Sequence, residues 1–392
     1  MAVVQISRIQ VRRGQKNAGS GLPQLASGEL GWAVDTRELY IGNGAVSEGA
    51  PAVGNTKVLT EFDNIFSLTE AYTYRTDDAY IVTGGDVSTP IVRSLQARLD
   101  DTVSGRSFGL TGQTSQIATA KLQTAIDQLY LNSATKGSAQ SKIVLHLEAG
   151  EYIVDDTIYI PPYATIVGAG SGKTIIRTST ASTTIFKTVN SNSTPGAPAT
   201  DASTTSVNQA TDIRLEGVTL ETTVPNKGLI LENCKDSVFR DVEVTGPWVS
   251  GNAVALTDVG IEMNSLSGTV ETKNNIFENC KVNGYSYGIS SDWDIHNNMW
   301  DNCSFASCSY GFAFATNLNT LNALSGSGQE KGPYNNTISN SRFDDINRHA
   351  IWSKFGTLNS SSNNSYVKVG TEGAAEFQAT HSVIKYEKPG NS

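Results

Sequence analysis

Charged residues are scarce in this 392-residue sequence, in which Asp, Glu, Lys and Arg together make up only 17%. The 29 lysines and arginines are scattered along the chain and are outnumbered by 38 aspartates and glutamates, which gives a formal net charge of −9. Binding of a phosphate backbone needs clustered cations. The sequence therefore predicts no nucleic-acid partner.

Long apolar runs are missing as well. No stretch reaches the ~20 apolar residues that a membrane-spanning helix needs. Residues 1–14 also lack the apolar run of a signal peptide. We therefore expect no membrane insertion, and assembly in a reducing cytoplasm.

Cysteine is rare, and its four residues lack the spacing of a zinc ribbon or of a small disulfide scaffold. We interpret Cys234, Cys280, Cys303 and Cys308 as small buried hydrophobic side chains. We expect neither a metal site nor a cofactor.

Glycine is abundant, with 36 residues, and it occurs together with many Ser, Thr and Asn, a composition typical of β-rich chains. Five six-residue segments align without gaps, and each runs apolar, polar, turn residue, small, polar, apolar: 215–220, 239–244, 277–282, 300–305 and 338–343. Their third positions follow one another at steps of 24, 38, 23 and 38 residues: Gly217, Asp241, Asn279, Asn302 and Asn340. The repeat predicts coils of ~23 residues, two of which carry insertions of ~15 residues.

Coils of a parallel solenoid stack ~4.8 Å apart, so equivalent residues form ladders along the stack. Asn, Asp and Gly at the third position suit a tight bend in the left-handed region, where stacked amides can also hydrogen-bond. Cys280 and Cys303 then form an interior stack, and we expect no bridge between them.

A helix is predicted over residues 116–130, because apolar side chains recur there at helical spacing, and strand-like segments follow from residue 143. The helix with Ala125-Ile126-Asp127, the strand ending in Gly150-Glu151-Tyr152 and the turn Gly168-Ala169-Gly170 resemble the opening of the pectate-lyase-like β-helix family found in phage tailspikes. The resemblance implies an all-β fold, a right-handed parallel β-helix over residues 111–392. The helix would plug its N-terminal end, where apolar core and strand edges are otherwise exposed.

Residues 1–60 form a separate unit, rich in turns. Its motifs are Ile9-Gln10-Val11-Arg12-Arg13-Gly14, Gly28-Glu29-Leu30-Gly31-Trp32, Asp35-Thr36 and Leu39-Tyr40-Ile41-Gly42-Asn43-Gly44. In this order they resemble the N-terminal module of phage tail-fibre and receptor-binding proteins, and they are similar to the β-prism-like piece of the major tropism determinant proteins. The resemblance implies three intertwined chains at a virion attachment point.

Size also favours a trimer, because a unit of ~45–60 residues without disulfides or a metal usually needs oligomerisation to bury enough surface. An independent small barrel of the SH3-like kind is the alternative. Residues 61–110 are interpreted as a connector with a short helix that begins near Ser88-Thr89-Pro90.

One candidate catalytic site follows from the repeat, which aligns Glu216, Arg240, Glu278, Asp301 and Ser339 in one outward column. Glu278 and Asp301 are one coil apart, where their carboxyl groups could reach the ~5–5.5 Å separation of a retaining glycosidase. A solvated pair of surface carboxylates is the alternative. The column permits sugar cleavage without indicating it.

Asp292 and Asp294 form a second candidate, together with His296 on the same side of a predicted strand. Trp293 and Trp300 flank them and could offer a face on which a sugar stacks. A polar face over a core aromatic residue is the alternative.

A third cluster contains Asp344, Asp345, Arg348 and His349, which a surface ion pair explains equally well. Residues 168–174 look like a phosphate-binding loop, but Val167 stands where that motif has glycine, and a strand follows rather than a helix. We interpret them as a turn between coils. No catalytic residue is assigned, and whether the protein is an enzyme is left open.

The two resemblances together imply a structural virion protein of a phage tail: a fibre, spike or baseplate-attached subunit. It would be a homotrimer, assembled in the host cytoplasm, and its N-terminal module would bind other tail or baseplate proteins. A host-surface polysaccharide is a further candidate partner. The alternative function is that of a tailspike depolymerase, a hydrolase or lyase that cleaves capsular or lipopolysaccharide sugars.

Overall fold

A computed structural model of the chain describes residues 11–17, 24–44, 47, 54–61, 63, 101–131, 143–197, 203–266, 270–291, 295–314, 333–353, 359–370 and 384–386. The chain divides into two compact units, Met1–Asp100 and Asp101–Ser392. The helix expected near Ser88 lies outside the described residues. Within the described part of the chain, no helix is both long enough and apolar enough to span a membrane.

The first unit contains a four-stranded sheet with the strands β1 (Arg12–Gly14), β2 (Leu30–Ala33), β3 (Glu38–Gly42) and β4 (Asn55–Val58). β1 and β2 are parallel, whereas the other two pairings are antiparallel. Leu25, Ala33 and Tyr40 are buried together. Gly42 is required beside them, because a Cβ atom there would lie 2.1 Å from the carbonyl oxygen of Ala26.

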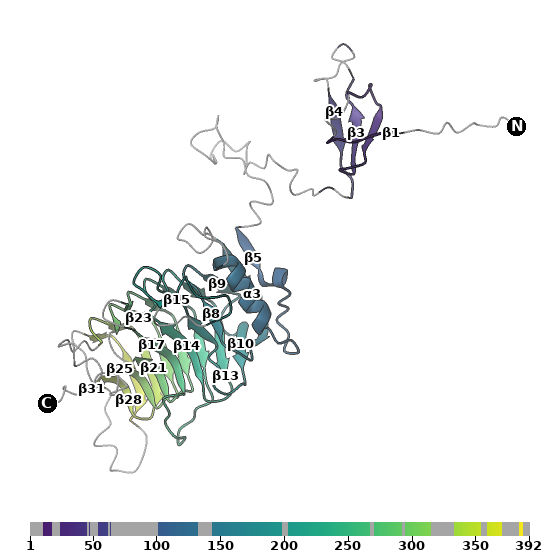
Figure 1. The fold of residues 1–392 in the computed structure, drawn as a ribbon. Coiled ribbons are helices and arrows are strands. Elements are labelled where there is room, and N and C mark those ends of the chain that lie inside the picture. The colour runs from purple at the N-terminus through teal and green to yellow at the C-terminus, as the bar shows by residue number, and fades with distance from the viewer. Residues whose placement is uncertain are drawn as a thin grey trace. The chain divides into compact units, whose positions relative to one another are not determined.

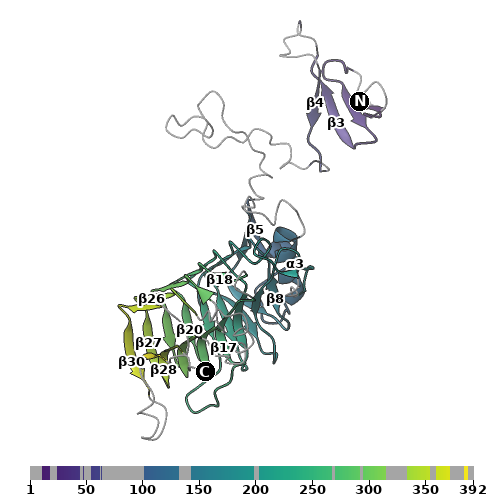
Figure 2. The same cartoon turned by 60° about the vertical axis from the view of Figure 1, so that its left-hand side comes forward.

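The second unit is a stack of coils that contributes strands to three parallel sheets (Figures 1 and 2). The first sheet has nine strands: β5 (Thr102–Ser104), β6 (Val144–Leu147), β9 (Thr165–Gly168), β12 (Arg214–Glu216), β15 (Val238–Arg240), β19 (Ile276–Glu278), β23 (Met299–Asp301), β26 (Thr337–Ser339) and β29 (Ser360–Ser362). The second has eight: β7 (Gly150–Ile153), β10 (Thr174–Thr178), β13 (Thr219–Thr222), β16 (Glu243–Thr245), β20 (Lys281–Asn283), β24 (Ser304–Ala306), β27 (Arg342–Ile346) and β30 (Ser365–Val369).

The third sheet also has eight strands: β8 (Ile158–Ile160), β11 (Phe186–Thr188), β14 (Lys227–Glu232), β17 (Val259–Asn264), β21 (Tyr287–Ser291), β25 (Tyr310–Phe314), β28 (His349–Ser353) and β31 (Ile384–Tyr386). A short pair, β18 (Thr272–Lys273) and β22 (Ile295–His296), lies outside these sheets. The predicted fold class, a right-handed parallel β-helix, is confirmed. β5 lies within the range 61–110 that the sequence assigns to a connector, and it pairs with β6.

The turn between the first and second sheets explains the repeat. All five third-position residues have positive φ, and so does Asn363 one coil further on: Gly217 (65°), Asp241 (50°), Asn279 (55°), Asn302 (53°), Asn340 (51°) and Asn363 (54°). These residue types tolerate the left-handed region better than others do. The outward amides also bond along the stack, with 2.6 Å from Nδ2 of Asn302 to Oδ1 of Asn279. The predicted bend and amide ladder are confirmed.

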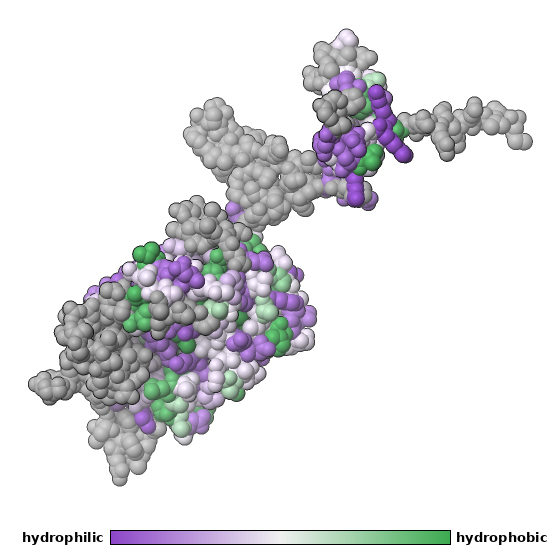
Figure 3. Space-filling view, in the orientation of Figure 1, coloured by the Kyte–Doolittle hydropathy of each residue, from purple (hydrophilic) through white to green (hydrophobic). Residues whose placement is uncertain are grey.

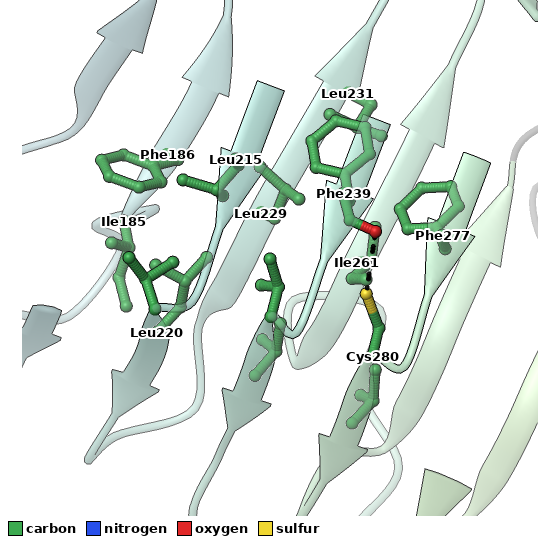
Figure 4. Close-up of a cluster of buried hydrophobic side chains, with 14 of the residues drawn as sticks. Ile185, Phe186, Leu215, Leu220, Leu229, Leu231, Phe239, Ile261, Phe277 and Cys280 are labelled. Carbon is green, nitrogen blue, oxygen red and sulfur yellow. Dashed lines mark hydrogen bonds between the residues drawn. The ribbon is translucent and has the colours of Figure 1, made fainter. Parts of the chain in front are cut away.

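The interior is filled by ladders of large apolar side chains. Phe239, Phe277 and Trp300 stack with ring centroids 4.8 and 5.3 Å apart. Figure 4 shows Phe239 and Phe277 side by side, with the Cys280 thiol 3.4 Å from the carbonyl oxygen of Phe239. All four cysteines are buried and free, which confirms their interpretation as small buried hydrophobic side chains.

A second amide ladder lies inside the stack, just before the first-sheet strands. Nδ2 of Asn275 donates to Oδ1 of Asn298, Nδ2 of Asn298 to Asn336, and Nδ2 of Asn336 to Asn359, each over 3.0 Å. Asn275, Asn298 and Asn336 are almost fully buried. The ladder therefore satisfies polar groups that would otherwise be buried without partners.

Helix α3 (Thr119–Tyr130) lies at the N-terminal end of the stack (Figure 1). It buries Leu122, Ile126 and Leu129 against the coil interior. The backbone edges are also paired at this end: β5 pairs with β6, Ala118 donates to the Ile153 carbonyl of β7 over 2.7 Å, and the Gln123 side chain bonds to β8. The first strands of the second and third sheets, β7 and β8, thus have partners at their outer edges, whereas β5 is itself the edge strand of the first sheet.

The described surface of the β-helix is mixed in character. Figure 3 shows hydrophilic and hydrophobic residues interspersed over the face in view. Loops of different length leave the three sheets at their corners, so the faces of the sheets differ in what flanks them. These flanking segments decide which face can hold a ligand.

Candidate functional site

The predicted outward column on the first sheet exists. Glu216, Arg240, Glu278, Asp301 and Ser339 are successive partners in the parallel register of β12, β15, β19, β23 and β26. Arg240 donates to Oε2 of Glu278 from Nε (2.8 Å) and Nη2 (2.6 Å). One candidate carboxylate is therefore engaged in an ion pair with the preceding coil.

Asp301, the other candidate carboxylate, is also engaged. Its Oδ1 accepts hydrogen bonds from the Ser339 hydroxyl and from Nδ2 of Asn340, both over 2.7 Å. These two bonds hold the pKa of Asp301 below its usual value. A retaining glycosidase needs one carboxyl group kept protonated as the acid. The lowered pKa of Asp301 does not suit that acid, and Glu278 is bonded to Arg240. The catalytic role of Glu278 and Asp301 stays a prediction.

The second candidate is only partly described. Asp292, Asp294 and Trp293 lie outside the described residues. His296 is buried in β22, its ring stacks on Tyr334 with centroids 4.6 Å apart, and its Nε2 lies 3.5 Å from Oε2 of Glu271. Glu271 also pairs with Lys273 at 3.0 Å.

Trp300 does not offer a sugar-stacking surface, contrary to the expectation above. It is fully buried and stacks on Phe277 within the β-helix. It points inward because it occupies the first, apolar position of the repeat, which is an interior position in every coil.

The third cluster is divided between two sheets. Asp344 in the second sheet pairs with Arg342 at 2.6 Å, and Asp345 adopts a positive φ of 55°. Arg348 and His349 instead lie at the start of β28 in the third sheet, beside Tyr310. The surface ion pair that the sequence suggested therefore involves Arg342, which was not part of the predicted cluster.

An outward strip of aromatic side chains lies on the third sheet. The rings of Tyr287 and Tyr310 stack with centroids 5.0 Å apart and planes 5° apart, and Trp352 stacks on Tyr310 at 4.8 Å. These three residues, the aromatic strip, belong to a hydrophobic cluster separate from the core. Tyr287 and Tyr310 are only 8% and 7% exposed, and Trp352 is half-buried. Gly311 lies between the outward Tyr310 and the inward Phe312 of β25. It cannot be replaced, because a Cβ atom there would lie 2.7 Å from the Ala350 carbonyl oxygen.

A cation accompanies the aromatic strip. The Arg348 guanidinium lies 5.6 Å from the centre of the Tyr310 ring, and its Nη1 donates to the Tyr310 hydroxyl over 3.0 Å. Burial raises the pKa of Tyr287 to about 12, so its hydroxyl stays neutral at physiological pH. The strip thus combines neutral aromatic rings with a permanent positive charge.

Residues 246–258, here called the insertion, flank the strip. The backbone N–H of Trp248 donates to the Gly284 carbonyl over 2.8 Å, and Nδ2 of Asn347 donates to the Ser250 hydroxyl over 2.9 Å. Val254 packs against the hydrophobic cluster that contains Tyr287, Tyr310 and Val259. The insertion also exposes two apolar residues, Val249 (59%) and Leu256 (50%).

The aromatic strip was missed by sequence reasoning, although a signal for it exists. Ser-Tyr-Gly occurs at residues 286–288 and again at 309–311, one coil apart. In a strand with one buried face, a tyrosine followed by glycine marks a side chain that points away from a closely packed backbone.

Residues 168–174 form a turn, as interpreted. Their backbone donors are used internally: Gly170 N–H bonds to the Gly217 carbonyl (3.0 Å) and Gly172 N–H to the Thr219 hydroxyl (2.8 Å). Strand β10 follows directly. Among the described residues, no group of three or more His, Cys, Asp or Glu side chains could hold a metal ion.

A family model described as rhamnogalacturonase A/epimerase, pectate lyase-like, matches residues 102–332. The match confirms the resemblance to pectate-lyase-like β-helix proteins. No curated protein is significantly similar in sequence.

Among solved structures, Geobacillus virus E2 ORF18 is similar with a TM-score of 0.53 and 14% identity, over 90% of this chain and 60% of that one. The bacteriophage phi29 gene product 12 N-terminal fragment has a TM-score of 0.46 and 16% identity, over 68% of this chain and 41% of that one. The Dettilon tailspike protein gp208 has a TM-score of 0.47 and 13% identity, over 72% and 49%. The chain thus spans 41 to 60% of the length of these structures.

Proposed function

The chain belongs to the rhamnogalacturonase A/epimerase, pectate lyase-like family through residues 102–332, and on that premise we propose that it is a bacteriophage tail protein that attaches the virion to a host-surface polysaccharide. The aromatic strip with Arg348 is the observation that carries this proposal. Sugar rings stack on aromatic faces, and the half-buried Trp352 is the more accessible ring of the strip. A guanidinium binds carboxylate or phosphate groups through paired donors. An acidic polysaccharide is therefore the expected ligand.

The viral assignment rests on the N-terminal motifs and on the fold. Geobacillus virus E2 ORF18 is a viral protein with a similar fold, which supports a place in a phage particle. In this proposal the chain is a fibre, spike or baseplate-linked subunit, and the first unit binds other tail proteins.

A homotrimer belongs to the same proposal, and the first unit supports it. Val11, Arg13, Trp32, Val34 and Leu39 line a shallow groove on the sheet, and Val34 is 55% exposed. A small unit with few buried apolar residues gains stability when such a face is covered by another copy. Sedimentation of the purified chain tests this point, and a stable monomer would contradict it.

Sugar cleavage is the second candidate function, and membership of a family named after sugar-acting enzymes favours it. The bonding of Glu278 and Asp301 favours attachment without cleavage by these two residues. Purified protein should be incubated with polysaccharides from candidate hosts and assayed for binding, for new reducing ends and for unsaturated uronates. Binding without new ends supports attachment. Cleavage that Glu278→Gln or Asp301→Asn abolishes would overturn it in favour of a depolymerase.

A further inference from the structure

The carboxyl group of Asp258 is buried at the end of the insertion, and the residue is only 2% exposed. Its Oδ2 accepts hydrogen bonds from the backbone N–H (2.9 Å) and the hydroxyl (2.8 Å) of Ser286. Its Oδ1 has no hydrogen-bond partner among the described residues. No Lys, Arg or His in the described part of the chain pairs with it.

The titratable groups that face Asp258 do not balance its charge. They are the Tyr285 phenol, from the loop before β21, and the Cys308 thiol, from the loop before β25. Burial raises the pKa of both groups, to about 12 for Cys308, so both are neutral at physiological pH. The hydroxyl of Ser309 is also fully buried, and it too lacks a hydrogen-bond partner among the described residues.

The same contacts hold the C-terminal end of the insertion. The Ser286 hydroxyl accepts a hydrogen bond from the Ala255 N–H over 3.2 Å while it bonds to Asp258. The side chain of Ser286, which directly precedes β21, therefore links the buried carboxyl group to the backbone of the insertion. Because Val254 packs against the hydrophobic cluster that contains Tyr287 and Tyr310, movement of this end would change how that cluster is covered.

A buried carboxylate without a cation is unfavourable, and such a group usually binds a proton instead. Burial raises the pKa of Asp258, and the two bonds from Ser286 offset this only in part, so the pKa lies above its usual value. Asp258 therefore binds its proton more tightly when the insertion is closed than when it is open. Closure therefore weakens as the pH rises from the ordinary Asp value, ~3.9, towards the raised pKa.

We propose that Asp258 is a proton-dependent anchor, which holds the insertion against the aromatic strip when it is neutral and loosens it when it ionises. The consequence for sugar binding rests on the proposed function: if the aromatic strip binds a sugar, the pH controls how far the insertion covers it. Asp258 contacts no ligand in this account and acts by positioning the insertion.

Hydrogen exchange of the full chain, read by mass spectrometry on peptides from residues 246–258, tests the anchor. After correction for the intrinsic exchange rate, wild-type protection should fall by up to about tenfold per pH unit between about pH 4 and the raised pKa, and then level off. Asp258→Asn keeps an acceptor for Ser286 without a titrating group, and its protection should not vary with pH. Asp241→Asn is the matched control, because its turn position holds Asn in later coils, and it should behave as wild type.

The inference would be overturned if the protection of the wild-type insertion did not vary with pH, a measurement that needs no variant. It would also be overturned if Asp258→Asn showed the same pH dependence of protection as the wild type. Polysaccharide binding is measured separately on the same samples. Loss of the proposed sugar-binding function would leave the exchange result unchanged, so the two failures are distinguishable.

Discussion

The side-chain amide of Gln123 forms a strand-like pair with Tyr159, since Nε2 donates to the Tyr159 carbonyl over 3.1 Å and Oε1 accepts from its N–H over 2.7 Å. Tyr159 lies in β8, the first strand of the third sheet, so the amide takes the place of a missing neighbouring strand. The glutamine is itself oriented by Asp127, whose Oδ1 lies 3.0 Å from Nε2. The edge of the third sheet at the N-terminal end of the β-helix is thus paired with one helix side chain.

Replacement of Gln123 by Ala should therefore weaken this end of the β-helix. Two backbone groups of Tyr159 lose their partner, and we expect a loss of about 1–3 kcal/mol in the free energy of unfolding. Gln128→Ala on the exposed side of the same helix is the control and should change stability little. Denaturant unfolding followed by circular dichroism compares the two, and equal stabilities would show that the amide pair does not matter.

The positive-φ position in the turn between the first and second sheets should tolerate glycine better than alanine. Asn302 has a φ of 53°, and Gly217 occupies the equivalent position in an earlier coil. We expect Asn302→Gly to be tolerated, whereas Asn302→Ala should cost about 1–2 kcal/mol, because a Cβ atom without a polar group is strained at positive φ. Thermal unfolding of both variants measures the difference, and an alanine variant as stable as the glycine one would refute the explanation of the repeat.

Much of the β-helix could be predicted because its turn residues are restricted by backbone conformation. The positions of Asp241, Asn279 and Asn302 repeat since few other residues adopt positive φ there. The buried asparagines of the ladder that includes Asn298 could not be distinguished in the sequence from the many other asparagines. A buried amide leaves no pattern of apolar residues that would mark it. Interior positions within the repeat were correct for Cys280 and Cys303.

The candidate sites were harder to predict, since they depend on which coils lie side by side and on which way each turn directs a side chain. Trp300 was suggested as a sugar-stacking face because it lies close to Asp292 and Asp294 in the sequence, although the repeat places it at an apolar position. Arg240 was aligned correctly with Glu278, but a sequence alignment does not reveal that the two side chains would bond rather than leave the carboxylate available. The aromatic strip requires three strands that are 23 and 39 residues apart, from Tyr287 to Tyr310 and from Tyr310 to His349, to be placed in register.

The first unit should lose stability in acid through Glu38. Burial alone would raise the pKa of this carboxyl group, but hydrogen bonds from Lys16, Lys57, Thr36 and Tyr40 outweigh burial and hold the pKa well below its usual value. A lowered pKa means that the stabilisation is complete above the unfolded value, ~4.3, and is lost as the pH falls towards the folded value.

Glu38→Gln should therefore destabilise the sheet at neutral pH and reduce its dependence on acid. Hydrogen exchange of peptides from β2 and β3 in the full chain provides the measurement. Glu61→Gln is the control, because Glu61 is exposed at the surface. An acid dependence that is identical in Glu38→Gln and the wild type would contradict the role of this carboxylate.

The four cysteines should not react with thiol reagents in the folded protein. Burial raises the pKa of Cys234 and Cys308 to about 12, and a thiolate is the reactive form. We expect labelling by iodoacetamide only after unfolding, with four thiols then titrated and no disulfide between Cys280 and Cys303. Rapid labelling of the native chain, or fewer than four thiols after unfolding without reductant, would disagree with this arrangement.

Attachment through the aromatic strip is tested most directly by the affinity of two arginine variants for an acidic host polysaccharide. Arg348→Gln removes the cation beside Tyr310, whereas Arg342→Gln removes an exposed arginine of the second sheet that pairs with Asp344. We expect Arg348→Gln to bind the polysaccharide at least about tenfold more weakly, which corresponds to the loss of one charged hydrogen-bonded contact. The affinity of Arg342→Gln should be almost unchanged. Equal binding by both variants and the wild type would contradict attachment through the strip.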